Sequence, residues 1–215
     1  MPDDRRAHAR GGNRRDRHAG ARGQATEALP VVVGDWTLFF HPLFLDQLER
    51  LTAAAEAETQ AEAERVTEQA AKGGQPSLAS ERLGPNVKLL AAVQDLMLVT
   101  IPEKPTRKEY RQGGTLGDSR KHWFRAKFGG GRFRLFFRFR ADVSVLVFAW
   151  MNDDDTLRTY GSSTDAYRTF ARMLGQGHPP DDWDALLLAC QDRSAIGRGS
   201  AAVAKHRAKK SSRSD

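Results

Sequence analysis

Residues 121–140 read KHWFRAKFGGGRFRLFFRFR and combine a strand pattern with dense positive charge. The stretch has seven Lys or Arg residues and no acidic residue, and most of its other positions are Phe, Trp, Leu or Ala. Apolar and polar residues alternate on both sides of three consecutive glycines, which is typical of two strands joined by a tight turn. The stretch therefore predicts a β-hairpin that is apolar on one face and cationic on the other.

The register of this hairpin depends on which glycines form the turn. The two apolar faces coincide only if two of the glycines at 129–131 make a two-residue turn. The preferred register pairs Arg125 with Arg134, and the alternative shifts the partners along the same face. Like charges that face each other destabilise a sheet, so we interpret the cationic face as a phosphate-binding surface. Protection of a solvent-facing strand against aggregation explains any single cation more simply.

Two aromatic residues, Trp123 and Phe136, lie on the same predicted face as the cations. Aromatic rings among cations are the combination that proteins use to bind single-stranded nucleic acid. The alternative, that both rings cover the edge of the core, explains them equally well.

The remaining pattern indicates an α+β fold with a sheet of about four strands. Residues 143–151 are apolar on both faces and should form the central strand. A helix is expected from Pro42, projecting or fraying beyond Leu51, and a second one ends at Pro102. The other predicted elements are strands at 36–40, 122–128 and 132–139, a helix capped by Ser163 and ended by Gly175, and a last helix from Pro180.

Charge divides the chain into a folded domain and two basic ends. Residues 1–28 and 191–215 are rich in Arg, Lys, Gly, Ala and Ser, so we expect a disordered arm and a disordered tail around one domain at 29–190. A single cysteine, Cys190, excludes an intramolecular disulfide, and no apolar run is long enough to span a membrane. These features favour a cytoplasmic protein.

Other candidate sites have simpler explanations. The carboxylates of Asp153–Asp155 follow the central strand and could bind a divalent metal, but Asp and Asn also favour turns, which we prefer here. His122 is expected to be a core-edge histidine rather than a base. No cofactor or metal is predicted.

Five motifs give the chain a specific resemblance. They are FFHPLF at 39–44, YRQGGTLGD at 110–118, RAKFGGGRFRLFFRF at 125–139, WMNDDDTLRTYGSSTDAY at 150–167 and GHPPDDW at 177–183. With these motifs the chain resembles YhaV-type toxins of the RelE/ParE superfamily, over roughly residues 34–190.

The resemblance implies a RelE-like fold, with an antiparallel or mixed twisted sheet against two N-terminal helices and short C-terminal helices. It also implies an endoribonuclease that cleaves the mRNA of translating ribosomes, as the toxin of a type II toxin–antitoxin system. The expected partner is an AbrB-like antitoxin of the PrlF type. The alternative is a non-catalytic toxin of the ParE kind that inhibits a protein such as gyrase.

Ribonucleases of the RelE type use basic residues and no metal, because the ribose 2′-hydroxyl attacks the adjacent phosphate. The resemblance assigns the paired basic positions to Arg125 and Lys127, with Lys127 as the expected base, and the phosphate clamp to Arg134. Arg158 and Tyr160 are expected to act on the leaving group. RNA binding is expected from Lys121, Trp123, Arg132, Phe136 and Arg138.

Overall fold

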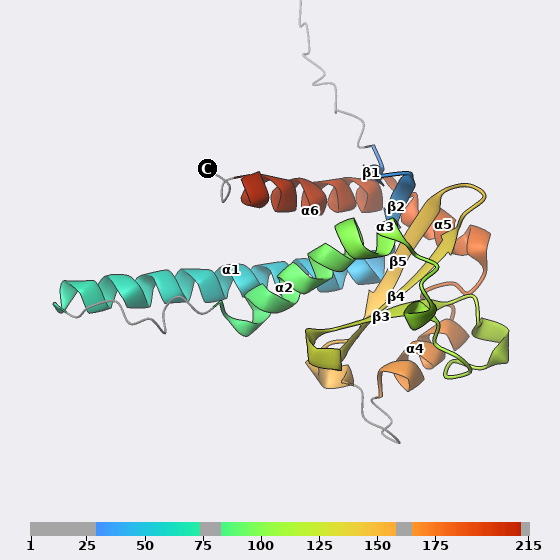
Figure 1. Ribbon diagram of the computed structural model, residues 1–215, viewed down its shortest axis with the longest axis horizontal. Coiled ribbons are helices and arrows are strands. Elements are labelled where there is room, and N and C mark those ends of the chain that lie inside the picture. The colour runs from blue at the N-terminus through green and yellow to red at the C-terminus, as the bar shows by residue number, and fades with distance from the viewer. Residues whose placement is uncertain (1–28, 74–82, 158–164, 212–215) are drawn as a thin grey trace, which may run out of the picture.

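Helices cover both faces of a single β-sheet (Figure 1). The computed structural model describes residues 29–73, 83–157 and 165–211. Its strands are β1 (Val31–Val33), β2 (Trp36–Phe40), β3 (Phe124–Phe128), β4 (Phe133–Arg140) and β5 (Val145–Met151). Its helices are α1 (Pro42–Ala71), α2 (Pro85–Asp95), α3 (Ile101–Glu103), α4 (Ala166–Gly175), α5 (Trp183–Cys190) and α6 (Arg193–Ser211).

The sheet has the strand order β1-β2-β5-β4-β3. β2 pairs with β5 in parallel, and the other neighbours are antiparallel, so the sheet is mixed. All seven residues of β5 are buried, which confirms the prediction that this apolar segment is the central strand. The sheet has one strand more than expected, because the short segment Val31–Val33 turns back through Gly34, at φ 55°, and pairs with β2.

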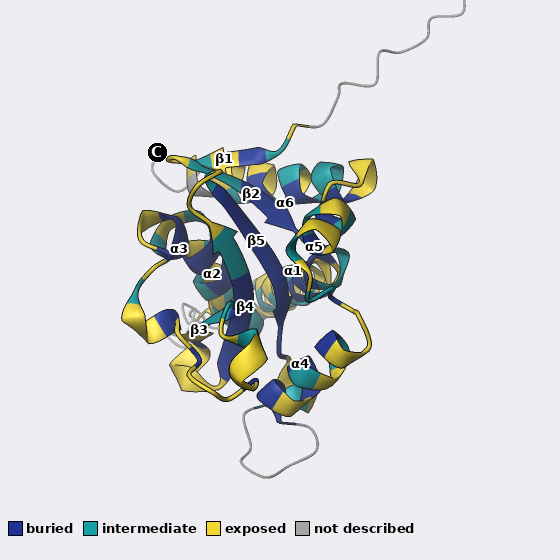
Figure 2. Ribbon diagram, turned by 90° about the vertical axis from the view of Figure 1, so that its right-hand side faces the viewer, coloured by how far each residue is buried: buried dark blue, intermediate teal, exposed yellow. Residues whose placement is uncertain are grey.

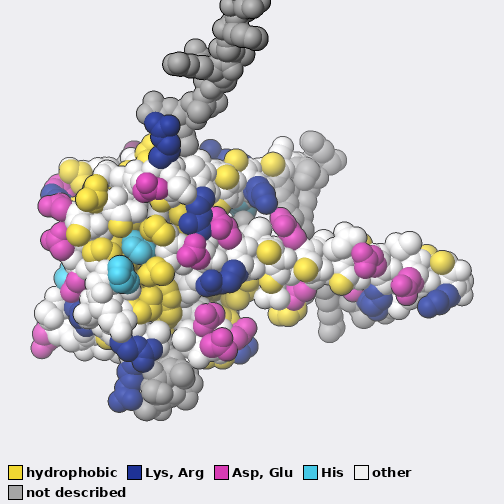
Figure 3. Space-filling model, turned by 180° about the vertical axis from the view of Figure 1, so that it is seen from behind, with side chains coloured by type: hydrophobic (Ala, Val, Ile, Leu, Met, Phe, Trp, Pro, Cys, Tyr) yellow, Lys and Arg dark blue, Asp and Glu magenta, His cyan; other side chains and the backbone are white. Residues whose placement is uncertain are grey.

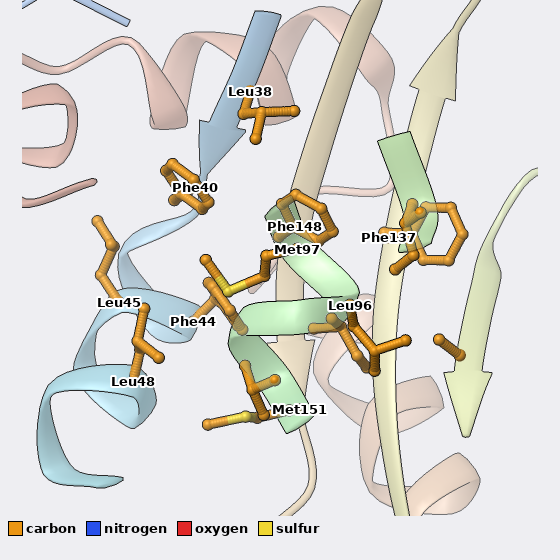
Figure 4. Packing of buried hydrophobic residues seen from close by; sticks show 14 of the residues in the cluster. Leu38, Phe40, Phe44, Leu45, Leu48, Leu96, Met97, Phe137, Phe148 and Met151 are labelled. Atoms are coloured by element: carbon orange, nitrogen blue, oxygen red, sulfur yellow. The ribbon is translucent and has the colours of Figure 1, made fainter. Parts of the chain in front are cut away.

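The larger core lies between the sheet and the layer formed by α1, α2 and α6. Phe44 and Leu48, predicted to lie on the buried face of the first helix, are almost fully buried. Figure 4 shows Phe44 close to Phe40 and Phe148, and the rings of the latter two stack at 5.8 Å between centroids. Such aromatic packing fixes the first helix against β2 and β5.

Of the two alternatives expected beyond Leu51, projection and fraying, the structure shows projection, because the first helix continues to Ala71 as an arm (Figure 1). Its alanine-rich sequence has high helix propensity, and Ala55 is buried. Glu58 also accepts hydrogen bonds from the backbone N–H groups of Asn86, at 3.0 Å, and Val87, at 3.2 Å. It thereby caps α2, whose N-cap Gly84 has no side chain to do so. Seen from behind, the arm carries both acidic and basic side chains (Figure 3).

A second, smaller core lies between the other face of the sheet and helices α4 and α5. Phe170 of α4 stacks on Phe136 at 4.2 Å and on Trp150 at 5.6 Å between centroids. The N-cap of α4 is Asp165, which accepts from the N–H of Tyr167 at 3.0 Å, whereas the predicted cap Ser163 lies outside the described residues. α5 begins at Trp183 rather than at Pro180. Figure 2 shows these helices on one side of the buried sheet.

The segment expected to be a disordered tail contains helix α6. Its buried Ala195 and Val203 belong to the larger core, and Arg198 pairs with Asp46 at 2.6 Å and Glu49 at 2.7 Å on α1. The sequence pattern did not predict this helix, because small residues and evenly spread cations leave it only a narrow apolar stripe. The basic arm at 1–28 lies outside the described residues. None of the helices in the described ranges is long and apolar enough to cross a membrane.

Candidate functional site

The hairpin forms as predicted, but in the alternative register. Lys127 faces Arg134 and Arg125 faces Phe136. The connection runs through Gly129–Gly131, and all three glycines have positive φ, at 54°, 65° and 80°. Phe128 and Phe133 close the hairpin with a ring contact of 5.4 Å on the apolar face. This aromatic pair explains why the register that pairs Arg125 with Arg134 is not adopted.

Most cations of the hairpin have partners, contrary to the unpaired charge that the local sequence indicated. Lys121 pairs with Asp118 at 2.7 Å, and Arg132 approaches Asp154 at 3.6 Å. Arg138 is half-buried between the rings of Trp123 and Trp183, and its Nη1 donates to the carbonyl of Asp181. Burial lowers the pKa of Arg138, with Asp181 opposing the shift. Lys121 and Arg138 therefore contact other groups of the protein in this structure, and their expected RNA contacts stay a prediction.

The phosphate clamp expected at Arg134 is also engaged with the protein. Its side chain is 6% exposed, and Nη1 donates to the carbonyls of Gly131, at 2.6 Å, and Phe133, at 2.9 Å. The backbone N–H of Arg134 donates to the side-chain carbonyl of Asn152. Arg134 therefore holds the glycine turn in place directly beside Lys127.

The two expected base-stacking rings, Trp123 and Phe136, are both fully buried. They belong to the second core, so they cannot stack on a base in this structure, and the core-edge explanation applies to them. The indole N–H of Trp123 donates to Asp181 at 2.7 Å, and His122 Nε2 lies 2.8 Å from the same oxygen. Burial would raise the pKa of Asp181, but the hydrogen bonds from Trp123 and His122 outweigh it and lower that pKa.

The clearest candidate for an anion site is a groove along the free edge of β3. We call it the β3 groove; its volume is about 530 Å³. It contains two of the predicted catalytic residues, Arg125 and Lys127, together with two further cations on its opposite wall. No carboxylate pairs with these four cations in the part of the chain that the structure describes. The groove is lined by Leu96, Thr100, Lys108, Glu109, Tyr110, Arg111, Arg125 and Lys127.

Buried contacts hold the two walls of the β3 groove together. Tyr110 is 4% exposed and packs edge-on against Phe137 at 5.4 Å between centroids. Arg111 forms an isolated β-bridge with Phe124 at the start of β3. Arg125 joins the walls directly, because Nη1 donates to the carbonyl of Glu109 and Nε donates to the hydroxyl of Tyr167 at 2.7 Å.

Three predicted features remain to be placed. Arg158 and Tyr160 lie outside the described residues. Asp153 begins a capping box with Thr156, as the turn interpretation predicted, and no cluster of potential metal ligands occurs in the described ranges. Lys108, Glu109 and Arg111 were not predicted as site residues. The shortage of acids between 107 and 140 indicated that region, but only the tertiary structure brings the 108–111 segment against β3.

Comparison with known proteins gives a family match. Residues 38–191 match a family model described as a toxin with endonuclease activity, of a toxin–antitoxin system. The chain belongs to the YhaV toxin family. The YhaV match includes both walls of the β3 groove and the whole second core. The chain is therefore a toxin with endonuclease activity, and the non-catalytic alternative is not favoured.

Curated relatives agree with the family assignment. Toxin YhaV of Escherichia coli O6:H1 is 40% identical over 164 residues, which are 76% of this chain and 97% of that protein. Ribonuclease toxin YhaV of Escherichia coli strain K12 is 39% identical with the same coverage. No solved structure matches the chain. YhaV membership also implies that the toxin has a partner antitoxin.

Proposed function

We propose that this toxin cleaves RNA by the metal-independent reaction that the resemblance to RelE-type ribonucleases implies. In this reaction the ribose 2′-hydroxyl loses its proton and its oxygen attacks the adjacent phosphorus. The bond from phosphorus to the 5′-oxygen of the next nucleotide then breaks, and that oxygen takes up a proton. The products are a 2′,3′-cyclic phosphate and a 5′-hydroxyl end.

The β3 groove is the observation that carries this proposal. Its four cations face a cavity of about 530 Å³ and have no carboxylate partners in the described part of the chain. Cations fixed around one phosphate stabilise the charge that develops on its oxygens in the transition state. Because Arg125 is already held at Nε and Nη1, it loses little side-chain freedom on binding a phosphate.

The predicted residues take distinct parts in this proposal. Arg125 and Lys127 contact the scissile phosphate, and exposed Arg132 adds affinity for the RNA strand. Arg134 acts through the glycine turn and through its positive charge next to Lys127. Arg158 and Tyr160, outside the described residues, are proposed to act on the leaving oxygen.

The partners follow from the same resemblance. We propose that the substrate is mRNA on translating ribosomes, in the cytoplasm, and that the antitoxin is an AbrB-like protein of the PrlF type. We also propose that this toxin belongs to the RelE/ParE superfamily. Phosphate contacts make RNA affinity dependent on salt, so added salt should weaken RNA binding to the β3 groove.

The test is to induce the full chain in cells and map new RNA 5′ ends. The double variant Arg111→Ala/Lys127→Ala removes one cation from each wall of the groove. The control Lys72→Ala removes an exposed lysine on the projecting arm, whose ion-pair partner among the described residues is Glu68. We expect new ends inside translated frames with the wild type and the control, and none with the double variant. New ends that persist in the double variant would refute the site.

A further inference from the structure

We propose that Glu109 is the general base that accepts the proton of the attacking 2′-hydroxyl. This inference deepens the proposed function and rests on it. The resemblance implies that Lys127 is the base that accepts this proton. The structure places Glu109 among the residues that line the β3 groove, and neither the local sequence pattern nor the family description assigns it a role.

Glu109 is the one carboxylate among the residues that line the β3 groove. It shares the wall with Lys108 and Arg111, and it faces the strand that carries Arg125 and Lys127. A ribose bound with its phosphate between these cations has its 2′-hydroxyl next to that phosphate. The reaction needs one proton acceptor close to a phosphate that cations hold. The base must lie within about 3 Å of the 2′-hydroxyl while the cations contact the adjacent phosphate.

The position of Glu109 is fixed by its backbone. Its carbonyl accepts a hydrogen bond from Arg125 Nη1, and the next residue, Tyr110, is anchored in the core. The N–H of Tyr110 also donates to the carbonyl of Arg107 at 3.1 Å, which closes the turn. The α-carbon of Glu109 therefore stays close to the guanidinium of Arg125, which is proposed to hold the phosphate.

The carboxylate of Glu109 has one long ion pair among the described residues. Arg107 Nη1 lies 3.9 Å from Glu109 Oε1, whereas Arg107 Nη2 makes a 2.6 Å contact with Glu103. The side chain of Glu109 is 69% exposed, so its carboxylate is accessible from solvent.

Charge state favours a carboxylate over Lys127 for this role. A carboxylate has lone pairs that can accept a proton. A lysine ammonium group has three donors and no acceptor, which suits contact with a phosphate. In the proposed step the 2′-oxygen bonds to phosphorus while its proton passes to a carboxylate oxygen of Glu109. Lys127 keeps its charge and stabilises the phosphate.

The test compares Glu109→Gln with a matched control, Glu103→Gln. Both side chains are 69% exposed and lie near Arg107, but Glu103 does not line the groove. Cleavage by the full chain is measured between pH 5 and pH 9 on a short RNA and on ribosomes programmed with mRNA. We expect Glu109→Gln to slow cleavage by about 100-fold or more and to remove the loss of rate toward acid pH. Glu103→Gln should stay within about twofold, as expected for a surface residue outside the site.

Two further measurements separate a base from a structural residue. Glu109→Asp keeps a carboxylate, so it should retain the acid-side loss of rate even if cleavage is slower. Binding of an RNA with one 2′-deoxy nucleotide at the cleavage position should not weaken in Glu109→Gln, because the variant removes a negative charge from the groove. A Glu109→Gln variant with the wild-type rate and pH profile would overturn the proposal. Cleavage of the 2′-deoxy RNA by the wild type would instead refute the proposed function itself.

Discussion

At the scale of single residues, Lys127 and Arg134 face each other across the hairpin but differ in environment. Lys127 is exposed in the β3 groove, whereas Arg134 is 6% exposed and bonded to two carbonyls of the turn. Its Nε has no hydrogen-bond partner in the structure. We therefore expect two cations from the same sequence pattern to differ in role, Lys127 in the proposed RNA cleavage and Arg134 in hairpin stability.

This difference predicts opposite effects on stability. Lys127→Ala should leave the free energy of unfolding within about 0.5 kcal/mol, because the side chain is exposed. Arg134→Ala should lower it by about 1–3 kcal/mol, because one buried and one partly buried carbonyl lose their donor. Urea denaturation of both variants measures the two values. Equal stability of the two variants would contradict the structural role of Arg134.

A second residue, His41, predicts how stability depends on pH. Burial, and secondarily the nearby His178, lowers the pKa of His41 from 6.5 to about 4. Its Nδ1 accepts from the N–H of Leu43, which a protonated ring could not do. Between these two pH values the unfolded chain binds a proton that the folded chain does not, so stability falls as pH decreases from 6.5 to 4. The loss should be about 3 kcal/mol.

The variant His41→Asn keeps a helix-capping acceptor but cannot titrate, so it should lose most of this pH dependence. The control His178→Asn removes only the charge of His178, which is the weaker cause of the lowered pKa of His41. This control should keep most of the pH dependence of stability. Urea denaturation at pH 7 and pH 5 gives the comparison. An unchanged slope in His41→Asn would show that other groups set the acid sensitivity.

Residue types and alternation were sufficient to predict the hairpin, its cationic positions and the buried positions of the first helix. They could not predict that Trp123 and Phe136 lie in a second core. That burial depends on α4 and α5, which follow 30 or more residues later and pack across the same face. Alternation within two strands contains no information about which face a distant helix covers.

At the scale of elements, α6 shows close packing where composition predicted disorder. Gly199 lies against Phe40, and a Cβ at this position would come within 2.5 Å of the ring. The helix therefore approaches β2 through a residue without a side chain. Gly, Ala and Lys residues give this segment only a weak apolar pattern in the sequence. The close approach of Gly199 to Phe40 in the structure explains why the helix packs there.

This contact predicts that Gly199→Val lowers the free energy of unfolding by about 1–3 kcal/mol through overpacking. The control Gly175→Ala adds a Cβ where no atom lies within 4 Å and should have little effect. Thermal or urea unfolding of the two variants distinguishes them. A Gly199→Val variant as stable as the wild type would mean that α6 does not pack on β2 in solution.

At the scale of the whole molecule, the groove exists because β3 is the outer strand of the sheet. The segment 108–111 covers only part of this edge, leaving a channel between its cations and those of β3. The excess of cations between 107 and 140 was visible in the sequence. Their arrangement on two opposite walls was not, because it depends on the bridge between Arg111 and Phe124.

The family match covers residues 38–191, so β1 and α6 lie outside it. These two outer elements contact each other: the hydroxyl of Ser200 donates to the carbonyl of Leu29 at 2.6 Å. They cover the β2 side of the sheet, opposite the groove edge. We therefore expect this side of the molecule to contribute to stability and the β3 side to carry the proposed catalytic site.

The measurement that tests the central claim most directly is the chemistry of the RNA ends that the full chain produces with a chelator present. The account predicts cleavage that resists EDTA, leaves a 2′,3′-cyclic phosphate and a 5′-hydroxyl, and disappears in Arg111→Ala/Lys127→Ala. A 3′-hydroxyl with a 5′-phosphate, produced only without chelator, would contradict it, because those ends arise when a metal-activated water attacks the phosphate.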